Sequence, residues 1–143
     1  MTVAIDASRA ADTQKTGVGW YTYHLIDHLR VVIPQDVRVL LYTDRPLPAE
    51  LHPWPERWEE RVLRWGVVRW PLWSQLRLAA QVFRDCPDVF VVPAHVIPDA
   101  LACTRRCGRQ RPRIVTTIHD VVFRQFPETY SPRERWYLSL IHI

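Results

Sequence analysis

The 143-residue chain lacks the features that mark membrane-spanning and secreted proteins. No run of apolar residues approaches the roughly 18 needed to cross a bilayer. Residues 1–6 show neither the basic nor the apolar segment of a secretory signal. The three cysteines are an odd number, which fits reduced thiols better than a disulfide framework. These absences favour a cytoplasmic protein.

A complete set of metal ligands is also missing. His24 and His28 have the spacing of a zinc pair, but Leu25 stands where the zincin pattern has glutamate. Cys103 and Cys107 offer two thiolates, and no second pair completes a tetrahedral site. We therefore predict no metal site and interpret the two histidines as residues on the polar face of a helix.

The hydrophobic fraction of 48% is typical of a folded globular chain, and the length fits one domain over residues 1–143. Apolar segments of strand and helix periodicity alternate along it. The expected strands are 3–7, 37–43, 61–65, 88–92 and 114–118, and the expected helices are 18–32, 71–85 and a segment that starts at 131. This order predicts an α/β fold with a Rossmann-like parallel sheet flanked by helices.

The first expected helix follows a loop that contains Gly17 and Gly19, with Thr16 in the N-cap position. Glycines there let the backbone approach a ligand, and a helix N-terminus attracts anions. Thr22 replaces the third glycine of the dinucleotide fingerprint, so we do not predict an NAD site. Two interpretations of these glycines remain open: they contact a phosphate or a sugar more loosely, or they only make it easier for the helix to begin. The apolar face is expected at Val18, Tyr21, Leu25, Leu29 and Val32.

Two histidines each follow an expected buried strand. His95 comes shortly after residues 88–92, and His119 comes directly after the β-branched run 114–118. Ligands of open α/β sheets bind outside the carboxyl ends of the strands, where histidine and the adjacent Asp120 can exchange protons or hydrogen bonds. The alternative is that Asp120 caps the next turn and His119 packs.

Tryptophan and arginine are concentrated in two places. Five tryptophans interleaved with four arginines lie between residues 54 and 73, and five arginines lie between 105 and 113. Residues 1–100 carry a net charge of −1, and residues 101–143 carry +5. The tryptophans fit packing under arginine stems, a membrane or lipid-acceptor face, or a nucleic-acid platform. The basic segment fits a solvated loop or an anion-attracting surface.

Three segments together resemble a known family. They are Ile5-Asp6-Ala7 with residues 16–22 (TGVGWYT), residues 88–95 (DVFVVPAH), and residues 116–120 (TTIHD) with 126–132 (FPETYSP). In this order and spacing they resemble the N-terminal domain of retaining glycosyltransferases of family 4, which have the GT-B fold and are often mannosyltransferases. Trp20 stands where the family commonly has arginine, and Ser8 separates Ala7 from Arg9. Both departures bear on which acceptor the domain would bind, and neither bears on its fold.

The resemblance implies a domain that holds the acceptor and borders the donor sugar. It implies transfer of a hexosyl group, with retention, from a nucleotide sugar to a glycan or lipid-linked acceptor, without a metal or other cofactor. His119 is then expected beside the anomeric carbon, Asp120 holds the loop, and the glycines lie near the donor diphosphate. By match of motif, the catalytic residues are His119 and Asp120, and the substrate-binding residues are Gly17, Val18, Gly19, Trp20 and His95.

The family places nucleotide binding in a second, C-terminal domain, which residues 1–143 do not contain. No helix C-terminal signal follows residue 131, so we expect an incomplete domain of a longer chain, and whether residues 139–143 are native sequence stays open. Peripheral contact with the inner membrane surface is expected, and a nucleic-acid partner is not. Two alternatives are a non-catalytic sugar- or membrane-surface-binding module that works with a separate subunit, and a basic protein that binds nucleic acid or anionic membranes.

Overall fold

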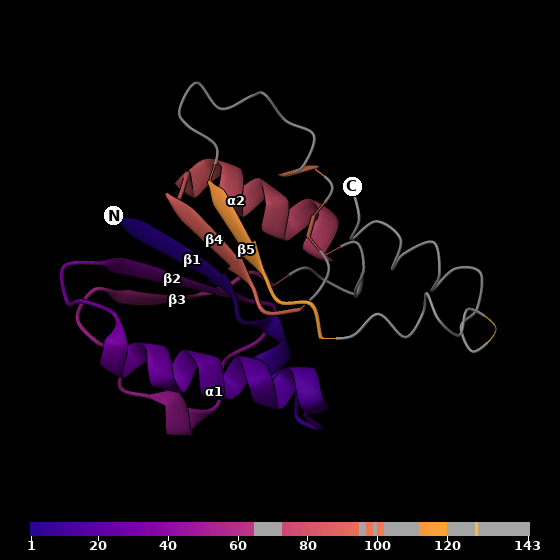
Figure 1. Ribbon diagram of the computed structural model, residues 1–143, viewed down its shortest axis with the longest axis horizontal. Coiled ribbons are helices and arrows are strands. Elements are labelled where there is room, and N and C mark those ends of the chain that lie inside the picture. The colour runs from indigo at the N-terminus through magenta and orange to yellow at the C-terminus, as the bar shows by residue number, and fades with distance from the viewer. Residues whose placement is uncertain (65–72, 95–96, 99, 102–111, 120–127, 129–143) are drawn as a thin grey trace.

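A computed structural model describes residues 1–64, 73–94, 97–98, 100–101, 112–119 and 128 (Figure 1). Its described strands form one parallel sheet in the order β3-β2-β1-β4-β5. The strands are β1 (Thr2–Asp6), β2 (Arg38–Thr43), β3 (Trp58–Val62), β4 (Val89–Val92) and β5 (Arg113–Thr116). The predicted fold class is confirmed: the chain is an α/β protein with a Rossmann-like parallel sheet.

Helices cover both faces of the sheet, and α1 and α2 lie on opposite sides of it (Figure 1). The α-helices that cover the sheet are α1 (Gly17–Val32) and the shorter α2 (Ala79–Asp85), the second preceded by a π-helical segment, η3 (Trp73–Leu78). Two short 3₁₀ helices, η1 (Ser8–Ala11) and η2 (Ala49–Leu51), lie in the loops after β1 and β2. This covering explains why the central strands are apolar on both faces.

Strand β2 shows how the sheet divides the core in two. Val39 and Leu41 belong to the cluster under α1, which includes Ile26. Leu40 and Tyr42 belong to the cluster under α2, which includes Val82. Successive strand residues point to opposite faces, so a continuous apolar run serves both clusters at once.

The strand order reverses between β1 and β4. From β1 the chain crosses through α1 to β2, and then reaches β3 on the same side of β1. It next crosses through η3 and α2 to β4, which pairs with the other edge of β1. The crevice outside the carboxyl ends of two such strands is where open α/β sheets bind ligands.

The predicted apolar face of α1 is only partly correct: Leu29 packs against the core, but the fully buried positions lie one residue further along the helix than predicted. The buried residues of the helix are Gly19, Thr22 and Ile26, whereas Tyr21 and Val32 are exposed. Thr22 can be buried because its hydroxyl donates to the carbonyl oxygen of Val18, at 2.8 Å between the two oxygens. Because its hydroxyl group has a hydrogen-bond partner within the helix, Thr22 occupies a core position that hydropathy would assign to its more apolar neighbours.

Two strand predictions also need correction. The third strand runs from Trp58 to Val62 rather than over 61–65, because Trp58 is a core residue and pairs with Val39. The segment 114–118 was expected to be buried throughout, but β5 is an edge strand among those described, with Val115 exposed. The predicted helix from 131 lies outside the described residues.

Three of the clustered tryptophans pack inside the molecule. Trp58 and Trp73 are buried, and Trp54 packs against the α1 cluster and stacks on Trp58 with 6.0 Å between ring centroids. The indole nitrogen of Trp73 donates to the carbonyl oxygen of Leu63 at 2.7 Å. Packing is therefore confirmed for these three, whereas Trp65 and Trp70 lie outside the described residues.

Candidate functional site

The candidate site lies at the carboxyl edge of the sheet, beside the point where the strand order reverses. Here the chain leaves β1 towards η1 and α1, leaves β4 at Pro93, and leaves β5 towards His119. Strands β4 and β5 are parallel neighbours, with Val92 opposite Thr116. The strand ends that precede His95 and His119 are therefore neighbours, although His95 itself lies outside the described residues.

His119 is held in place by groups from two other segments. Its Nε2 lies 2.8 Å from the carbonyl oxygen of Pro93, at the end of β4. A carbonyl oxygen only accepts hydrogen bonds, so Nε2 is the donor in this contact. The ring also meets the edge of Tyr21, with 5.0 Å between centroids. Asp120 lies outside the described residues.

Tyr21 lies at the candidate site, although the apolar periodicity of the sequence predicted it in the core. It is 39% exposed, and its hydroxyl lies 3.1 Å from Oγ1 of Thr117 in the segment after β5. Tyr21 is one helical turn after Gly17, so it projects from the N-terminal turn of α1 towards the strand ends. The spacing of Tyr21 from the glycine loop was the available signal for its place at the site.

The N-terminus of α1 is open to an anionic group. Thr16 occupies the predicted N-cap position, but its side chain makes no capping hydrogen bond, and the first turn contains no acidic residue. The first backbone N–H groups of a helix lack partners within the helix and carry partial positive charge. Gly17 is exposed, with no atom within 4 Å of the place where a Cβ would stand. A ligand can approach the backbone at Gly17.

Gly19 has a different role, because its face of the helix is buried. A Cβ there would stand 3.0 Å from the carbonyl oxygen of Arg9 in η1 and 3.2 Å from the Cβ of Lys15. The missing side chain allows α1 to pack against its own preceding loop. Gly19 therefore shapes the loop that presents Gly17 and does not itself leave space for a ligand.

The two glycines make a matched pair for measurement. We expect Gly19→Ala to lower the free energy of unfolding by about 1 kcal/mol, because overpacking outweighs the gain in helix propensity. We expect Gly17→Ala to change it by no more than about 0.5 kcal/mol, since its side chain meets nothing. Urea denaturation of both variants measures the difference, and equal stabilities would contradict the packing role of Gly19.

Aromatic rings and a lysine surround the exposed side chain of Trp20. Trp20 is 50% exposed and stacks on His24 with 5.8 Å between ring centroids. The Lys15 ammonium lies 5.3 Å from the Trp20 ring centroid and 5.6 Å from that of Tyr23. His28 is also exposed, and its Nδ1 lies 2.8 Å from the carbonyl oxygen of His24. The prediction that both histidines lie on the polar face is confirmed.

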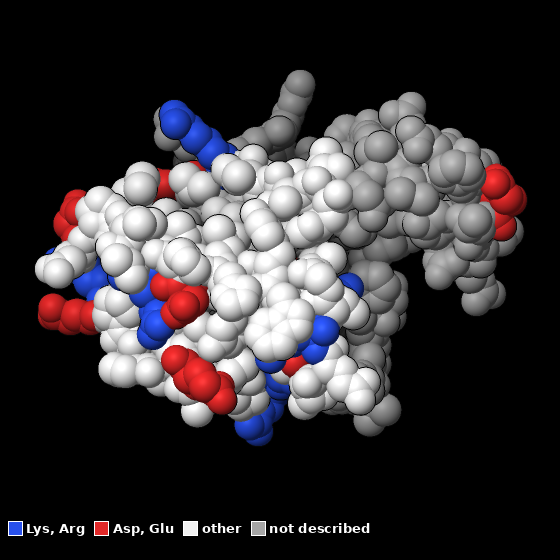
Figure 2. Space-filling model, turned by 60° about the horizontal axis from the view of Figure 1, so that its bottom comes forward, with Lys and Arg blue, Asp and Glu red and all other residues white. Residues whose placement is uncertain are grey.

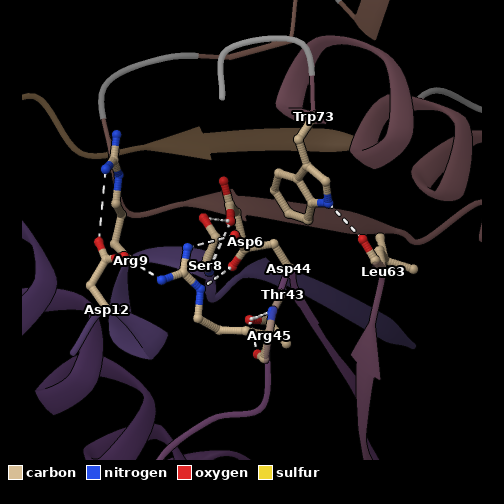
Figure 3. A network of polar contacts seen from close by, with 9 residues as sticks. All are labelled: Asp6, Ser8, Arg9, Asp12, Thr43, Asp44, Arg45, Leu63 and Trp73. Carbon is tan, nitrogen blue, oxygen red and sulfur yellow. Dashed lines mark hydrogen bonds and ion pairs between the residues drawn. The ribbon is translucent and has the colours of Figure 1, made fainter. Parts of the chain in front are cut away.

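A second polar group at this edge, centred on Asp6, was absent from the sequence prediction. Asp6 ends β1, and its Oδ1 accepts hydrogen bonds from the Ser8 amide at 3.1 Å and the Ser8 hydroxyl at 2.7 Å (Figure 3). Burial raises the pKa of Asp6, although the Ser8 hydrogen bonds oppose the shift. Asp44, after the neighbouring strand β2, raises it further through charge repulsion. The signals available in the sequence were an aspartate at a strand end and its place in the motif Ile5-Asp6-Ala7.

Charged residues of both signs are interspersed on the α1 side of the molecule (Figure 2). The described lysines and arginines of this face do not gather into a continuous basic patch. The basic run 105–111 lies outside the described residues. A nucleic-acid platform therefore gains no support from the described part of this face.

Within the described ranges, no three His, Cys, Asp or Glu side chains are grouped to hold a metal ion. No described helix is long and apolar enough to cross a membrane. Comparison with known proteins gives no match to a family model, a curated protein or a solved structure.

Proposed function

We propose that this chain is the acceptor-side domain of a retaining glycosyltransferase with the GT-B architecture. It works with a nucleotide-binding domain to move a hexosyl group from a nucleotide sugar to a glycan or lipid-linked acceptor. The observation that carries the proposal is the meeting of His119, Tyr21 and the end of β4 at one sheet edge. The ordered motifs of the sequence indicate which family the proposal names. In the proposed reaction no metal or other cofactor takes part.

The chemistry of glycosyl transfer matches the groups at this edge. The departing diphosphate needs hydrogen-bond donors, and the uncapped N-terminus of α1 at Gly17 and Val18 supplies backbone N–H groups. The oxocarbenium-like centre needs polar groups close to the anomeric carbon, which is the role we assign to His119. Trp20 and His95 then contact the acceptor, and Asp120 holds the loop after His119.

A hydrolase with two catalytic carboxyl groups is less well supported. Asp6 and Asp44 follow neighbouring strands, but both oxygens of Asp44 accept hydrogen bonds from Arg45, at 3.1 and 2.7 Å. A carboxylate whose two oxygens both accept hydrogen bonds from one guanidinium is already occupied and is poorly placed to take a proton from a substrate or a water. Among the described residues, this pair therefore does not provide a free acid and a free base.

We place the protein in the cytoplasm, in peripheral contact with the inner membrane surface that carries lipid-linked acceptors. A non-catalytic saccharide-binding module is the second candidate, favoured by the exposure of Trp20 and Tyr21 on successive positions of α1. Aromatic rings with one exposed face are suited to binding the apolar face of a sugar. Such a module binds saccharide alone and gains no affinity from a nucleotide diphosphate.

His119→Ala is expected to lower sugar transfer by at least about tenfold in the enzyme that unites this domain with its nucleotide-binding domain. The replacement removes a group at the reacting centre and leaves the two core clusters intact, so the protein remains folded. Initial rates at saturating nucleotide sugar measure the effect, and His28→Ala on the exposed face of α1 is the matched control. Equal rates for His119→Ala and the parent enzyme would refute this role for His119.

A further inference from the structure

Tyr21 connects helix α1 to the segment that carries His119, and it does so through two separate contacts. Its ring lies edge-to-face with the His119 imidazole, with 5.0 Å between the centroids and 86° between the ring planes. Its hydroxyl lies 3.1 Å from Oγ1 of Thr117, which is 96 positions away along the chain. One side chain therefore ties the first turns of α1 to the carboxyl end of β5.

The segment after β5 is also attached to the end of β4. The Thr117 amide donates to the carbonyl oxygen of Val92 at 3.1 Å. The His119 Nε2 donates to the carbonyl oxygen of Pro93 at 2.8 Å. Ile118 lies between these two residues and is 53% exposed. The contacts of Tyr21 add restraints from a different element, α1.

The hydrogen bond through Nε2 fixes the plane of the His119 ring only loosely. It sets the distance of Nε2 from the carbonyl oxygen of Pro93, but the ring can turn about the line that joins these two atoms. The torsion that rotates a histidine ring about its own stem is broad as well. An edge-to-face contact has a preferred angle, so the contact with Tyr21 selects one plane. That plane decides where the second ring nitrogen, Nδ1, faces.

Tyr21 itself stands on a firmly packed part of α1. Gly19 is buried, and a Cβ there would stand 3.0 Å from the carbonyl oxygen of Arg9 in η1. Thr22 is 0% exposed, and its hydroxyl donates to the carbonyl oxygen of Val18. Because buried residues flank Tyr21 along the helix, its backbone cannot move without disturbing the core. A side chain that orients another group needs such a support.

A contribution to stability is a poor explanation for these contacts. Tyr21 is 39% exposed, whereas Ile26 in the same helix is fully buried. The hydroxyl contact with Thr117 is exposed, and water can replace either partner, so it adds little to the free energy of unfolding. What the two contacts restrict is the orientation of the His119 ring.

We infer that Tyr21 is a positioning residue for His119: its ring fixes the plane of the imidazole, and its hydroxyl holds the segment that carries the imidazole. This inference rests on the proposed function for its effect on the reaction rate, whereas the orientation of His119 is measurable without any substrate. A displaced group at the reacting centre stabilises the transition state less, so the loss falls on kcat more than on KM.

NMR of the 143-residue chain measures the orientation, through residual dipolar couplings of the C–H bonds in the histidine rings. We expect Tyr21→Phe to leave the His119 couplings close to those of the parent, because the ring contact remains. We expect Tyr21→Leu to reduce them strongly, because the imidazole then samples several planes. The exposed ring of His28, further along α1, is the internal control. Unchanged His119 couplings in Tyr21→Leu would overturn the inference.

The rate gives a second measurement, in the enzyme that unites this domain with its nucleotide-binding domain. We expect Tyr21→Leu to lower kcat by about tenfold and to change KM by less than about twofold. The exposed residue Val31 on the same helix offers a control, and we expect Val31→Ala to leave both constants unchanged. Circular dichroism and thermal unfolding verify that the variants fold.

The hydroxyl contact can be removed from either side, which makes it testable by itself. Tyr21→Phe and Thr117→Val each delete one partner of the 3.1 Å contact. We expect each to lower kcat by about two- to threefold, and the double variant to lower it no further, since both changes remove the same contact. Losses that multiply in the double variant would show that the two hydroxyls act separately, and the tether would then be wrong.

The failure of this inference can be told apart from the failure of the proposed function. If His119→Ala lowers sugar transfer but Tyr21→Leu does not, the role of Tyr21 alone is wrong, whatever happens to the couplings. If Tyr21→Leu reduces the His119 couplings but His119→Ala transfers sugar as fast as the parent, Tyr21 orients the ring and the role assigned to His119 in the proposed function is refuted.

Discussion

Phe90→Ala is expected to lower the free energy of unfolding by about 3–5 kcal/mol. Phe90 is 0% exposed in β4, which pairs with β1 on one side and β5 on the other. Its ring packs in the cluster under α2, together with Leu78 and Val82. Truncation removes buried apolar surface and leaves a cavity between sheet and helix, and both changes favour the unfolded chain.

Urea denaturation at neutral pH measures this loss, and Leu76→Ala is the control on the same side of the sheet. Leu76 lies in η3 and is 55% exposed, so we expect its truncation to cost no more than about 0.5 kcal/mol. A loss below about 1 kcal/mol for Phe90→Ala would mean that the cluster under α2 is not a packed core.

Asp85→Ala is expected to destabilise the protein by about 2–3 kcal/mol at neutral pH, because Asp85 ties α2 to two strands. Its Oδ2 accepts hydrogen bonds from Tyr42 at 2.6 Å and Gln81 at 3.0 Å, and its Oδ1 accepts one from Arg61 at 2.5 Å. Tyr42 is fully buried, so removal of the carboxylate leaves its hydroxyl without this acceptor.

The loss should depend on pH with a defined sign. Burial by itself raises the pKa of Asp85, but the hydrogen bonds from Tyr42, Gln81 and Arg61 outweigh it and hold the pKa below the ordinary value of 3.8. A lowered pKa stabilises the folded protein above the unfolded-state value, and this contribution is lost as the pH falls through the folded-state value. The stability difference between Asp85→Ala and the parent should therefore narrow below about pH 4.

Urea denaturation between pH 7 and pH 3 tests this prediction, with Asp36→Ala as a control that removes an exposed carboxylate. We expect Asp36→Ala to change the stability by no more than about 0.5 kcal/mol over the same range. If the stability difference between Asp85→Ala and the parent protein stayed constant from pH 7 to pH 3, the charge of Asp85 would not contribute to stability as proposed. The same network raises the pKa of Tyr42, through burial first and then through Asp85, so its hydroxyl remains a donor.

The site was only partly predictable from the sequence. The strand end before His119 could be recognised because β-branched residues precede it, and the helix start at Gly17 because glycines and a turn precede an apolar periodicity. The partners of His119 could not be recognised, since Pro93 and Tyr21 are 26 and 98 positions away along the chain. Asp6 could be recognised as part of the motif Ile5-Asp6-Ala7, but the sequence did not show that its carboxyl group is buried.

The sequence by itself determined the order of strands and helices and the α/β class, because apolar periodicity is a local property of each segment. It also determined that the central strands are apolar on both faces, as the run Val39 to Tyr42 shows. The tertiary structure decided which side of α1 packs against the sheet. Gly19 and Thr22 are buried there, instead of the more apolar residues that the periodicity of the sequence predicted. It also decided that Asp6 is buried and that Tyr21 reaches the end of β5, because burial and contact depend on strands brought together by pairing across the sheet.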